Sequence, residues 1–142
     1  MDAVDHINVD VDALEPCYEF YRDALDLELV RPPADFQGEH AMFRAGETVV
    51  TLAETGRAEN WDERGLEHPL DKAHLAFETD REAYAALMDE FDDQFPKQGP
   101  YDWDEFEGFY FLDPDGNLLE VVTYEPPPGE RTRPLLTHDD VE

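Results

Sequence analysis

Cysteine and lysine are almost missing from this sequence of 142 residues. The single cysteine, Cys17, excludes a disulfide within the chain and a zinc site built from several cysteines. Lysine and arginine together number 10 against 37 aspartates and glutamates, so the formal net charge is −27 at pH 7. No basic cluster interrupts this acidity. We therefore expect no binding to nucleic acid and none to anionic membrane surfaces, because both carry negative charge themselves.

Long apolar runs are also missing, and the chain opens with no signal peptide, so we expect a cytoplasmic protein. Disorder is excluded by composition, because 41% of the residues are hydrophobic and 12% are aromatic. The carboxylates are spread through nearly every segment as a solvated coat. An excess of acidic residues with very little lysine is typical of proteins from salt-rich cytoplasm, so we predict a halophilic source.

Two parts of the chain repeat one plan, a short alternating strand followed by a helix. Residues 4–11 alternate as a strand, and Leu14, Cys17, Tyr18, Tyr21 and Leu25 then recur at helical spacing, with Asp12 as a candidate cap. Residues 72–79 form the second predicted strand. Thr79 or Asp80 can cap the helix after it, and the apolar face of that helix contains Tyr84, Leu87, Met88 and Phe91.

Each predicted strand and helix is followed by further strands joined by tight turns. These strands are 41–44 and 48–52 in the first half of the chain, and 109–112 and 117–124 in the second. The second turn, Asp113-Pro-Asp-Gly116, is a strong turn signal, because proline presets φ and glycine accepts a positive φ. The pattern predicts an α+β fold of two βαβββ modules.

The predicted boundaries follow from this repeat and from the segments without periodicity. We predict a single domain over residues 1–125 and a C-terminal tail or arm over 126–142. Within the domain, module one covers 1–54, a loop covers 55–71 and module two covers 72–125. Further loops are expected over 29–39 and 96–107.

His6 and His74 occupy the same place in the two opening strands, 68 residues apart. In the first strand Ile7, Val9 and Val11 share the apolar face, so His6 points to the opposite face. His74 likewise points away from Leu75 and Phe77. Three other histidines, His40, His68 and His138, have no counterpart in the repeat, and we interpret them as packed or solvated.

Glu120 lies inside the apolar run Leu118-Leu119-Glu120-Val121-Val122, where an isolated carboxylate is costly to bury. It therefore needs a cation or a hydrogen-bond donor. A structural ion pair with Arg44 is one solution. A metal ion is the other, since two histidines and one glutamate suit Fe(II), Mn(II), Co(II), Ni(II) or Zn(II) and leave coordination positions open.

Four aromatic residues are further candidates for this site. Tyr110 alternates with Phe109 and Phe111, so its hydroxyl can either point toward Glu120 as a hydrogen-bond donor or pack in the wall of the sheet. Trp61, Tyr101 and Trp103 fall in predicted loops. They either line a pocket or anchor those loops.

These motifs together resemble the vicinal oxygen chelate superfamily, over residues 4–125. The resemblance rests on Asp5-His-Ile-Asn-Val-Asp-Val11, Ala73-His-Leu-Ala-Phe77 and above all Phe109-Tyr-Phe-Leu-Asp-Pro-Asp-Gly-Asn-Leu-Leu-Glu120. That superfamily holds glyoxalase I, fosfomycin-resistance thiol transferases, extradiol dioxygenases and bleomycin-binding proteins. It implies a cup-shaped half-barrel of mixed sheet with helices outside, frequent dimerisation, and one divalent metal ion at His6, His74 and Glu120.

Departures from the family narrow the expected activity. Glyoxalase I has a fourth metal ligand in the last strand of module one, and aligning Gly46 with Gly116 puts that place at Val50, with no carboxylate or amide from 49 to 53. The acid/base histidine of the extradiol enzymes would fall at residues 101–103, where none occurs. Lys97-Gln98 of this chain resembles a basic contact to phosphonate in the fosfomycin enzymes. A strongly acidic protein, however, repels such a doubly charged anion.

We therefore expect a metal-dependent enzyme that chelates adjacent oxygens of a small substrate on a divalent metal ion and uses Tyr110 as catalytic donor. Ring-cleavage dioxygenase chemistry is the first choice, and thiol transfer or hydrolysis is the second. The alternative from another class is a non-catalytic binder of a cationic drug, similar to the bleomycin-resistance proteins. A homodimer is the expected assembly.

Overall fold

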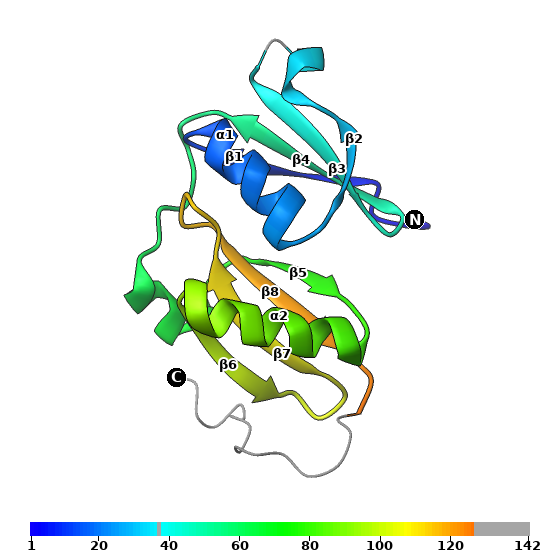
Figure 1. The fold of residues 1–142 in the computed structure, drawn as a ribbon, viewed down its shortest axis with the longest axis vertical. Helices are drawn as coiled ribbons and strands as arrows, with labels where there is room; N and C mark the ends of the chain where they lie inside the picture. Colours follow the sequence, from blue (N-terminus) through cyan, green and yellow to red (C-terminus); the bar gives the residue numbers. More distant parts are fainter. Residues whose placement is uncertain (37, 127–142) are drawn as a thin grey trace. The chain divides into compact units, whose positions relative to one another are not determined.

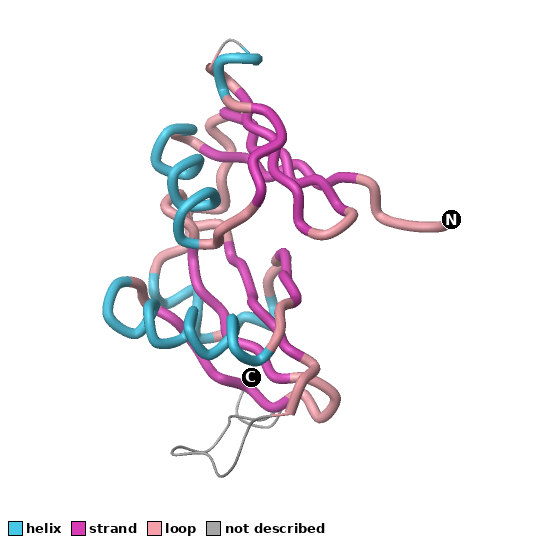
Figure 2. The backbone as a smooth tube through the Cα atoms, turned by 45° about the vertical axis from the view of Figure 1, so that its right-hand side comes forward, coloured by secondary structure: helices cyan, strands magenta, loops and turns pink. Residues whose placement is uncertain are grey.

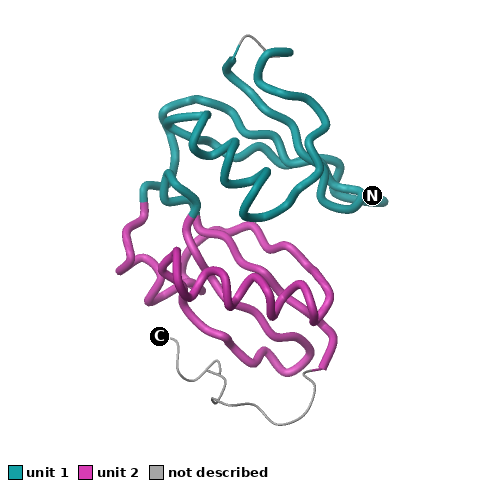
Figure 3. The backbone as a smooth tube through the Cα atoms, viewed as in Figure 1, with its two compact units in different colours: residues 1–60, 113–117 teal, residues 61–112, 118–142 magenta. Residues whose placement is uncertain are grey.

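The computed structural model describes residues 1–36 and 38–126, which form two compact units (Figure 3). Of the described residues, the first unit contains 1–60 together with 113–117, and the second contains 61–112 together with 118–126. The predicted tail over 126–142 lies outside the described residues except for Pro126.

The first unit is a four-stranded mixed sheet with a helix on one side (Figure 1). Its sheet order is β1-β4-β3-β2, in which β1 runs parallel to β4 and the other neighbours are antiparallel. The elements, in chain order, are β1 (His6–Val11), α1 (Leu14–Glu19), the π-helical turn η1 (Phe20–Ala24), β2 (Glu28–Arg31), the 3₁₀ turn η2 (Pro33–Phe36), β3 (His40–Ala45) and β4 (Thr48–Glu54).

The second unit repeats this connectivity, with sheet order β5-β8-β7-β6 and a parallel β5–β8 pair (Figure 1). Figure 2 shows strands in magenta and helices in cyan in both units. Two 3₁₀ turns, η3 (Glu63–Glu67) and η4 (Pro69–Asp71), precede it. Its elements are β5 (Leu75–Glu78), α2 (Arg81–Gln94), β6 (Lys97–Asp102), β7 (Glu107–Leu112) and β8 (Leu118–Thr123). The predicted α+β fold of two βαβββ modules is thereby confirmed.

In each unit the strand that follows the helix falls in a segment predicted from the sequence as loop. Strand β2 lies within 29–39 apart from its first residue, and β6 lies within 96–107. Both are edge strands, which tolerate exposed charges and even Pro100, because one side of an edge strand makes no ladder hydrogen bonds. Neither strand therefore has the alternating pattern on which the prediction depended.

The core of each unit forms where its helix packs on the apolar face of its sheet. In the first unit the ring of Phe43 on β3 stacks at 6.3 Å from Tyr21. In the second, Phe91 of α2 contacts Phe109 and Phe111 of β7, at ring distances of 5.9 and 4.8 Å. Within the described residues, no helix combines the length and apolar character needed to cross a bilayer.

Helix α1 begins differently from the prediction, because Asp12 does not cap it. The N-cap residue is Ala13, which has no side-chain oxygen to offer. Asp115 supplies the cap from the β7–β8 turn instead, its Oδ2 accepting from the amides of Asp12 and Ala13 at 2.6 and 3.0 Å. Asp12 accepts a hydrogen bond from the Ala58 amide at 3.2 Å. Helix α2 agrees with the prediction, since Asp80 accepts from the amide of Ala83.

Candidate functional site

Three of the four predicted site residues meet on one face of the second sheet. In the β5–β8 ladder Ala76 lies opposite Glu120, and in the β7–β8 ladder Tyr110 lies opposite the same residue. His74 immediately precedes β5 and has the same parity as Ala76. The predicted facing of His74, Tyr110 and Glu120 is therefore confirmed within this unit.

The side chains themselves are in contact. His74 Nε2 lies 3.3 Å from Glu120 Oε1, and the rings of His74 and Tyr110 meet edge to face with centroids 5.1 Å apart. Glu120 and Tyr110 are buried, with 4% and 2% of their surfaces exposed, whereas a quarter of the His74 side chain reaches solvent. The cluster is thus buried behind a histidine that is accessible.

The tautomer of His74 follows from its backbone contact. Its Nδ1 lies 3.0 Å from the carbonyl oxygen of Lys72, and a carbonyl can only accept, so Nδ1 carries the proton. Neutral imidazole then presents a lone pair at Nε2, facing the carboxylate of Glu120. Two acceptors at 3.3 Å repel each other unless a cation is shared, either a second proton on His74 or a metal ion.

The second oxygen of Glu120 supports the metal alternative. Oε2 is buried and has no hydrogen-bond partner among the described residues. A charged oxygen without a partner is costly in a protein interior, and such atoms mark places where a ligand or ion belongs. Nε2 of His74 and the carboxylate of Glu120 are donor types that Fe(II), Mn(II), Co(II), Ni(II) and Zn(II) accept, so the residues present fit a divalent ion.

Gly108 makes the room that Glu120 occupies. A Cβ atom at residue 108 would stand 2.5 Å from Glu120 Oε2 and 3.1 Å from Val122 Cγ1. Both distances are shorter than ordinary van der Waals contact, and Glu120 is too confined by its buried strand to move far. Gly108 is therefore a positioning residue that the sequence analysis missed, since glycine in a strand signals a close approach but not its partner.

Replacing Gly108 by alanine is expected to displace the Glu120 carboxylate and to weaken divalent metal binding by about 10- to 100-fold, the range for lost positioning contacts at metal sites. Isothermal titration with Mn(II) or Zn(II) measures the change. Gly56→Ala is the control for backbone strain, because a Cβ at residue 56 meets no atom within 4 Å and its positive φ of 71° strains only a loop of the first unit. Equal affinities for Gly108→Ala and the wild type would contradict the positioning role.

Tyr110 contributes a phenol hydroxyl to this cluster. Burial, the negative charge of Glu120 and a hydrogen bond to Glu120 all raise the pKa of the Tyr110 phenol well above its ordinary value of 10. The hydroxyl therefore keeps its proton throughout the physiological range. A protonated phenol beside the carboxylate can donate a hydrogen bond, and the donor role of Tyr110 toward a bound molecule stays a prediction.

His6 belongs to the first unit, at the start of β1. Its Nδ1 lies 2.8 Å from Oδ2 of Asp5, which again leaves Nε2 as the lone-pair nitrogen when the ring is neutral. The His6 side chain is 58% exposed. The two repeat-matched histidines thus share one tautomer, in which Nδ1 is tied to a neighbouring acceptor.

Within residues 1–36 and 38–126, no group of three His, Cys, Asp or Glu side chains lies close enough to hold a metal ion. His74 and Glu120 form a two-ligand pair in the second unit, while His6 lies in the first. The joint ligand set of His6, His74 and Glu120 therefore stays a prediction. Within the second unit His74 Nε2 lies beside Glu120 Oε1, and the alternative pairing with Arg44 of the first unit stays a prediction as well.

The register corrects one alignment made from the sequence. Residue 8, which is 68 positions before Ala76, lies opposite Thr51 on β4, whereas Ala76 lies opposite Glu120. The counterpart of Glu120 in the first unit is therefore Thr51 and not Val50. The two turns differ in length: two residues separate the paired residues Ala45 and Thr48, and five separate the paired residues Leu112 and Leu118. Aligning the glycines of these turns therefore displaces β4 by one residue relative to β8.

The predicted loop aromatics take two different positions. Tyr101 and Trp103 are buried, stack with ring centroids 5.0 Å apart, and join Tyr110 in a cluster with Leu66 and Leu118. They therefore pack behind the site as part of the core. Trp61 is 39% exposed, and the Lys72 ammonium lies 5.0 Å from the centre of its ring.

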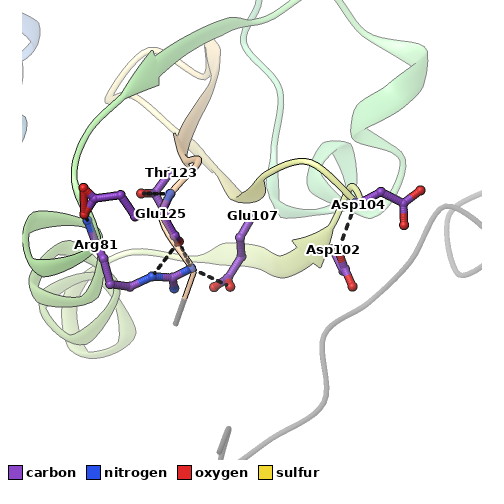
Figure 4. A network of polar contacts seen from close by, with 6 residues as sticks. All are labelled: Arg81, Asp102, Asp104, Glu107, Thr123 and Glu125. Atoms are coloured by element: carbon purple, nitrogen blue, oxygen red, sulfur yellow. Dashed lines mark hydrogen bonds and ion pairs between the residues drawn. The ribbon is translucent and has the colours of Figure 1, made fainter. Parts of the chain in front are cut away.

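A hollow of about 280 Å³ in the second unit lies at the end of β8 and is lined by several carboxylates around Arg81 (Figure 4). Arg81 bonds Glu107 at 3.1 Å and the carbonyl oxygen of Glu125 at 2.7 Å. These bonds join the start of α2 to β7 and to the segment after β8. The arrangement is a structural network, since its arginine is already engaged.

Comparisons with known proteins place the chain among related folds. Residues 3–121 match the family described as the glyoxalase/bleomycin resistance protein/dioxygenase superfamily. No curated protein matches the chain. Three solved structures with a similar fold are 16–24% identical to the chain, and at that level they show the fold alone.

A glyoxalase/dioxygenase from Nostoc punctiforme is 23% identical with a TM-score of 0.69, covering 88% of this chain and 92% of that one. A lactoylglutathione lyase from Agrobacterium tumefaciens is 24% identical with a TM-score of 0.64, covering 87% and 94%. The fosfomycin resistance protein FosX from Mesorhizobium loti is 16% identical with a TM-score of 0.64, covering 87% and 92%.

Proposed function

Since the chain belongs to the glyoxalase/bleomycin resistance protein/dioxygenase superfamily, we propose that it is an enzyme that holds one divalent metal ion at His6, His74 and Glu120. Fe, Mn, Zn, Ni and Co are the candidate metals. The observation that carries this proposal is the pair of facing acceptors, His74 Nε2 and Glu120 Oε1, beside the unpartnered Oε2. A shared cation relieves both features at once.

When bound, the metal supplies Lewis acidity toward two adjacent oxygens of a small substrate. The residues of the chain do the rest. Tyr110 donates its retained proton toward a substrate oxygen on which negative charge develops, and Lys72 holds the ring of His74 through its carbonyl oxygen. Gly108 keeps the Glu120 carboxylate in place, and burial of the cluster excludes water from its inner side.

Ring-cleavage dioxygenase chemistry on a diol is the first choice of reaction. In it one carbon–carbon bond breaks and both atoms of O₂ enter the product. A three-ligand set supports this choice over glyoxalase chemistry, because the place equivalent to Glu120 in the first unit holds the hydroxyl of Thr51 instead of a carboxylate. Thiol transfer or hydrolysis at an electrophile is the second choice, since it needs the same open metal site.

The deciding experiment is metal analysis of purified protein at high salt, beside a His74→Ala variant. The proposal expects one equivalent of metal in the wild type after reconstitution with Fe(II), Mn(II) or Zn(II), and far less in the variant. Oxygen uptake with catechol then tests the first choice of reaction. A wild type that holds no stoichiometric metal under any of these conditions would overturn the enzyme proposal.

Sequestration of a cationic compound is the second candidate function. The observation that favours it is a pocket of about 540 Å³ in the first unit, lined in part by the carboxylates of Glu15, Glu19 and Glu54. The Arg22 guanidinium, also in the lining, lies 5.0 Å from the centre of the Tyr18 ring, so a cation already occupies that aromatic face. Clustered carboxylates attract organic cations. The expected homodimer and cytoplasmic location are part of the proposal for either function.

We also propose that the acidic coat is an adaptation to salt. Lowering the KCl concentration from 2 M to 0.1 M is expected to lower the melting temperature by at least about 10 °C, because the Debye length grows from below 3 Å to about 10 Å and the net charge of −27 then repels itself. Calorimetry measures the shift. Sucrose in place of KCl is the control, since it stabilises folded proteins without screening charge. A melting temperature independent of salt would contradict the adaptation.

A further inference from the structure

Most cationic side chains of the described chain are bound to an acceptor. Arg22, Arg64, Arg81 and Lys97 pair with carboxylates, and Lys72 donates to the carbonyl oxygen of His68. Among the described residues, no hydrogen bond or ion pair engages the side chains of Arg31, Arg44 and Arg57. Three arginines without a carboxylate are unexpected in a chain with 37 acidic residues.

Two of these three arginines share a sheet face with His6. In the ladders of the first sheet, His6 lies opposite Val49, and Val49 lies opposite Arg44. Paired residues project to the same side of a sheet, and two strand spacings of about 4.8 Å put His6 and Arg44 about 10 Å apart at their Cα atoms. Both side chains are exposed.

Arg31 joins the same face from the edge strand. It lies opposite Met42, which lies opposite Thr51, the counterpart of Glu120. Glu28 lies across the ladder from Arg44 but makes no ion pair with it in the described chain. The polar face of the first sheet therefore combines a predicted metal ligand with two available guanidinium groups.

We propose that Arg44, with Arg31 beside it, binds an oxyanion of the substrate, such as a carboxylate or phosphate group, at the end away from the metal-chelating oxygens. This inference rests on the proposed function, in which His6 faces the metal. A guanidinium donates two parallel hydrogen bonds to an oxyanion, which gives direction as well as attraction. The substrate class is then an anionic compound with two adjacent oxygens.

The net charge of the protein does not oppose this assignment at the salt concentrations that we propose. At 1 M ionic strength the Debye length is about 3 Å, so the acidic coat no longer repels an approaching anion at long range. A hydrogen-bonded contact with Arg44 acts at shorter distance and is screened less. Salt thus removes the long-range repulsion and leaves the local recognition.

The test compares two probes on protein reconstituted with Zn(II), which binds catechols without consuming oxygen. Catechol has the adjacent oxygens alone, and 3,4-dihydroxybenzoate adds a carboxylate across the ring. Calorimetric titration is expected to show 3,4-dihydroxybenzoate binding about five- to tenfold more tightly than catechol in the wild type. This affinity ratio should fall to about one in Arg44→Gln, since glutamine cannot form the charged pair.

Arg57→Gln is the matched control, because Arg57 is exposed in the same unit, lacks a partner and lies outside the sheet. Its affinity ratio should equal that of the wild type, and circular dichroism checks that all variants are folded. The inference would be overturned if Arg44→Gln kept the wild-type affinity ratio, or if Arg57→Gln lowered that ratio as much as Arg44→Gln does. Catechol binding to the Zn(II) protein would still uphold the proposed function in either case. Failure of the Zn(II) protein to bind either probe would overturn both.

Discussion

Replacing Glu120 by glutamine is expected to weaken divalent metal binding at least about 100-fold and yet leave the metal-free protein as stable as the wild type, or more stable. Affinity falls because the substitution removes a charged ligand, a larger loss than the 10- to 100-fold that outer contacts contribute. Stability does not fall, because Glu120 Oε2 is buried without a partner and a neutral amide is less costly to bury. Calorimetric titration and urea unfolding at pH 8 measure the two effects.

A structural ion pair between Glu120 and His74 makes the opposite prediction. Breaking a buried pair by removing one charge costs about 3–5 kcal/mol of unfolding free energy, and metal affinity would not change. Glu78→Gln is the matched control, because Glu78 lies on the same face of the sheet but is exposed. A less stable Glu120→Gln protein with undiminished metal binding would therefore exclude the metal site.

Replacing Asp113 by alanine is expected to lower the free energy of unfolding by about 3 kcal/mol, because several buried donors lose their acceptor together. Asp113 Oδ2 accepts from the Tyr21 hydroxyl at 2.8 Å and from Asn117 Nδ2 at 2.9 Å, while Oδ1 accepts from the amides of Asp115 and Asn117. Urea unfolding of the full chain measures the loss.

Two further variants separate this network from a general effect of removing a carboxylate. Asp35→Ala removes an exposed aspartate of the first unit and should change stability by less than about 0.5 kcal/mol. Tyr21→Phe deletes one donor and should lower the free energy of unfolding by about 1 kcal/mol. The double variant Tyr21→Phe/Asp113→Ala should lose less stability than the sum of the two single losses, because the two side chains share a hydrogen bond. Additive losses would contradict the shared network.

Burial raises the pKa of the Asp113 carboxyl above its ordinary value, although its hydrogen bonds oppose that shift. A raised pKa means that the folded protein binds a proton more readily than the unfolded chain does. The contribution of Asp113 to stability is therefore greatest at acidic pH and falls as pH rises through the raised value. The turn signal that sequence reasoning identified at residues 113–116 is thus also a buried polar centre.

The sequence by itself determined the repeat, the fold class and the common sheet face of the candidate site residues in the second unit. Side chains alternate strictly along a strand, so the parity of His74, Tyr110 and Glu120 could be read without coordinates. The apolar neighbours of Glu120 likewise showed that its carboxylate is buried. These properties depend on local spacing and composition, which a sequence records directly.

Other features depended on partners that are distant in sequence, and only the tertiary structure decided them. Asp115 caps α1 from more than a hundred positions away, and Gly108 leaves space for Glu120 on the neighbouring strand. Thr51 was recognised as the counterpart of Glu120 only from the strand register, since two turns of different length shift the alignment. Arg44 shares the face of His6 for the same reason. Such relations arise from strand pairing and packing, which bring together residues that local sequence patterns do not connect.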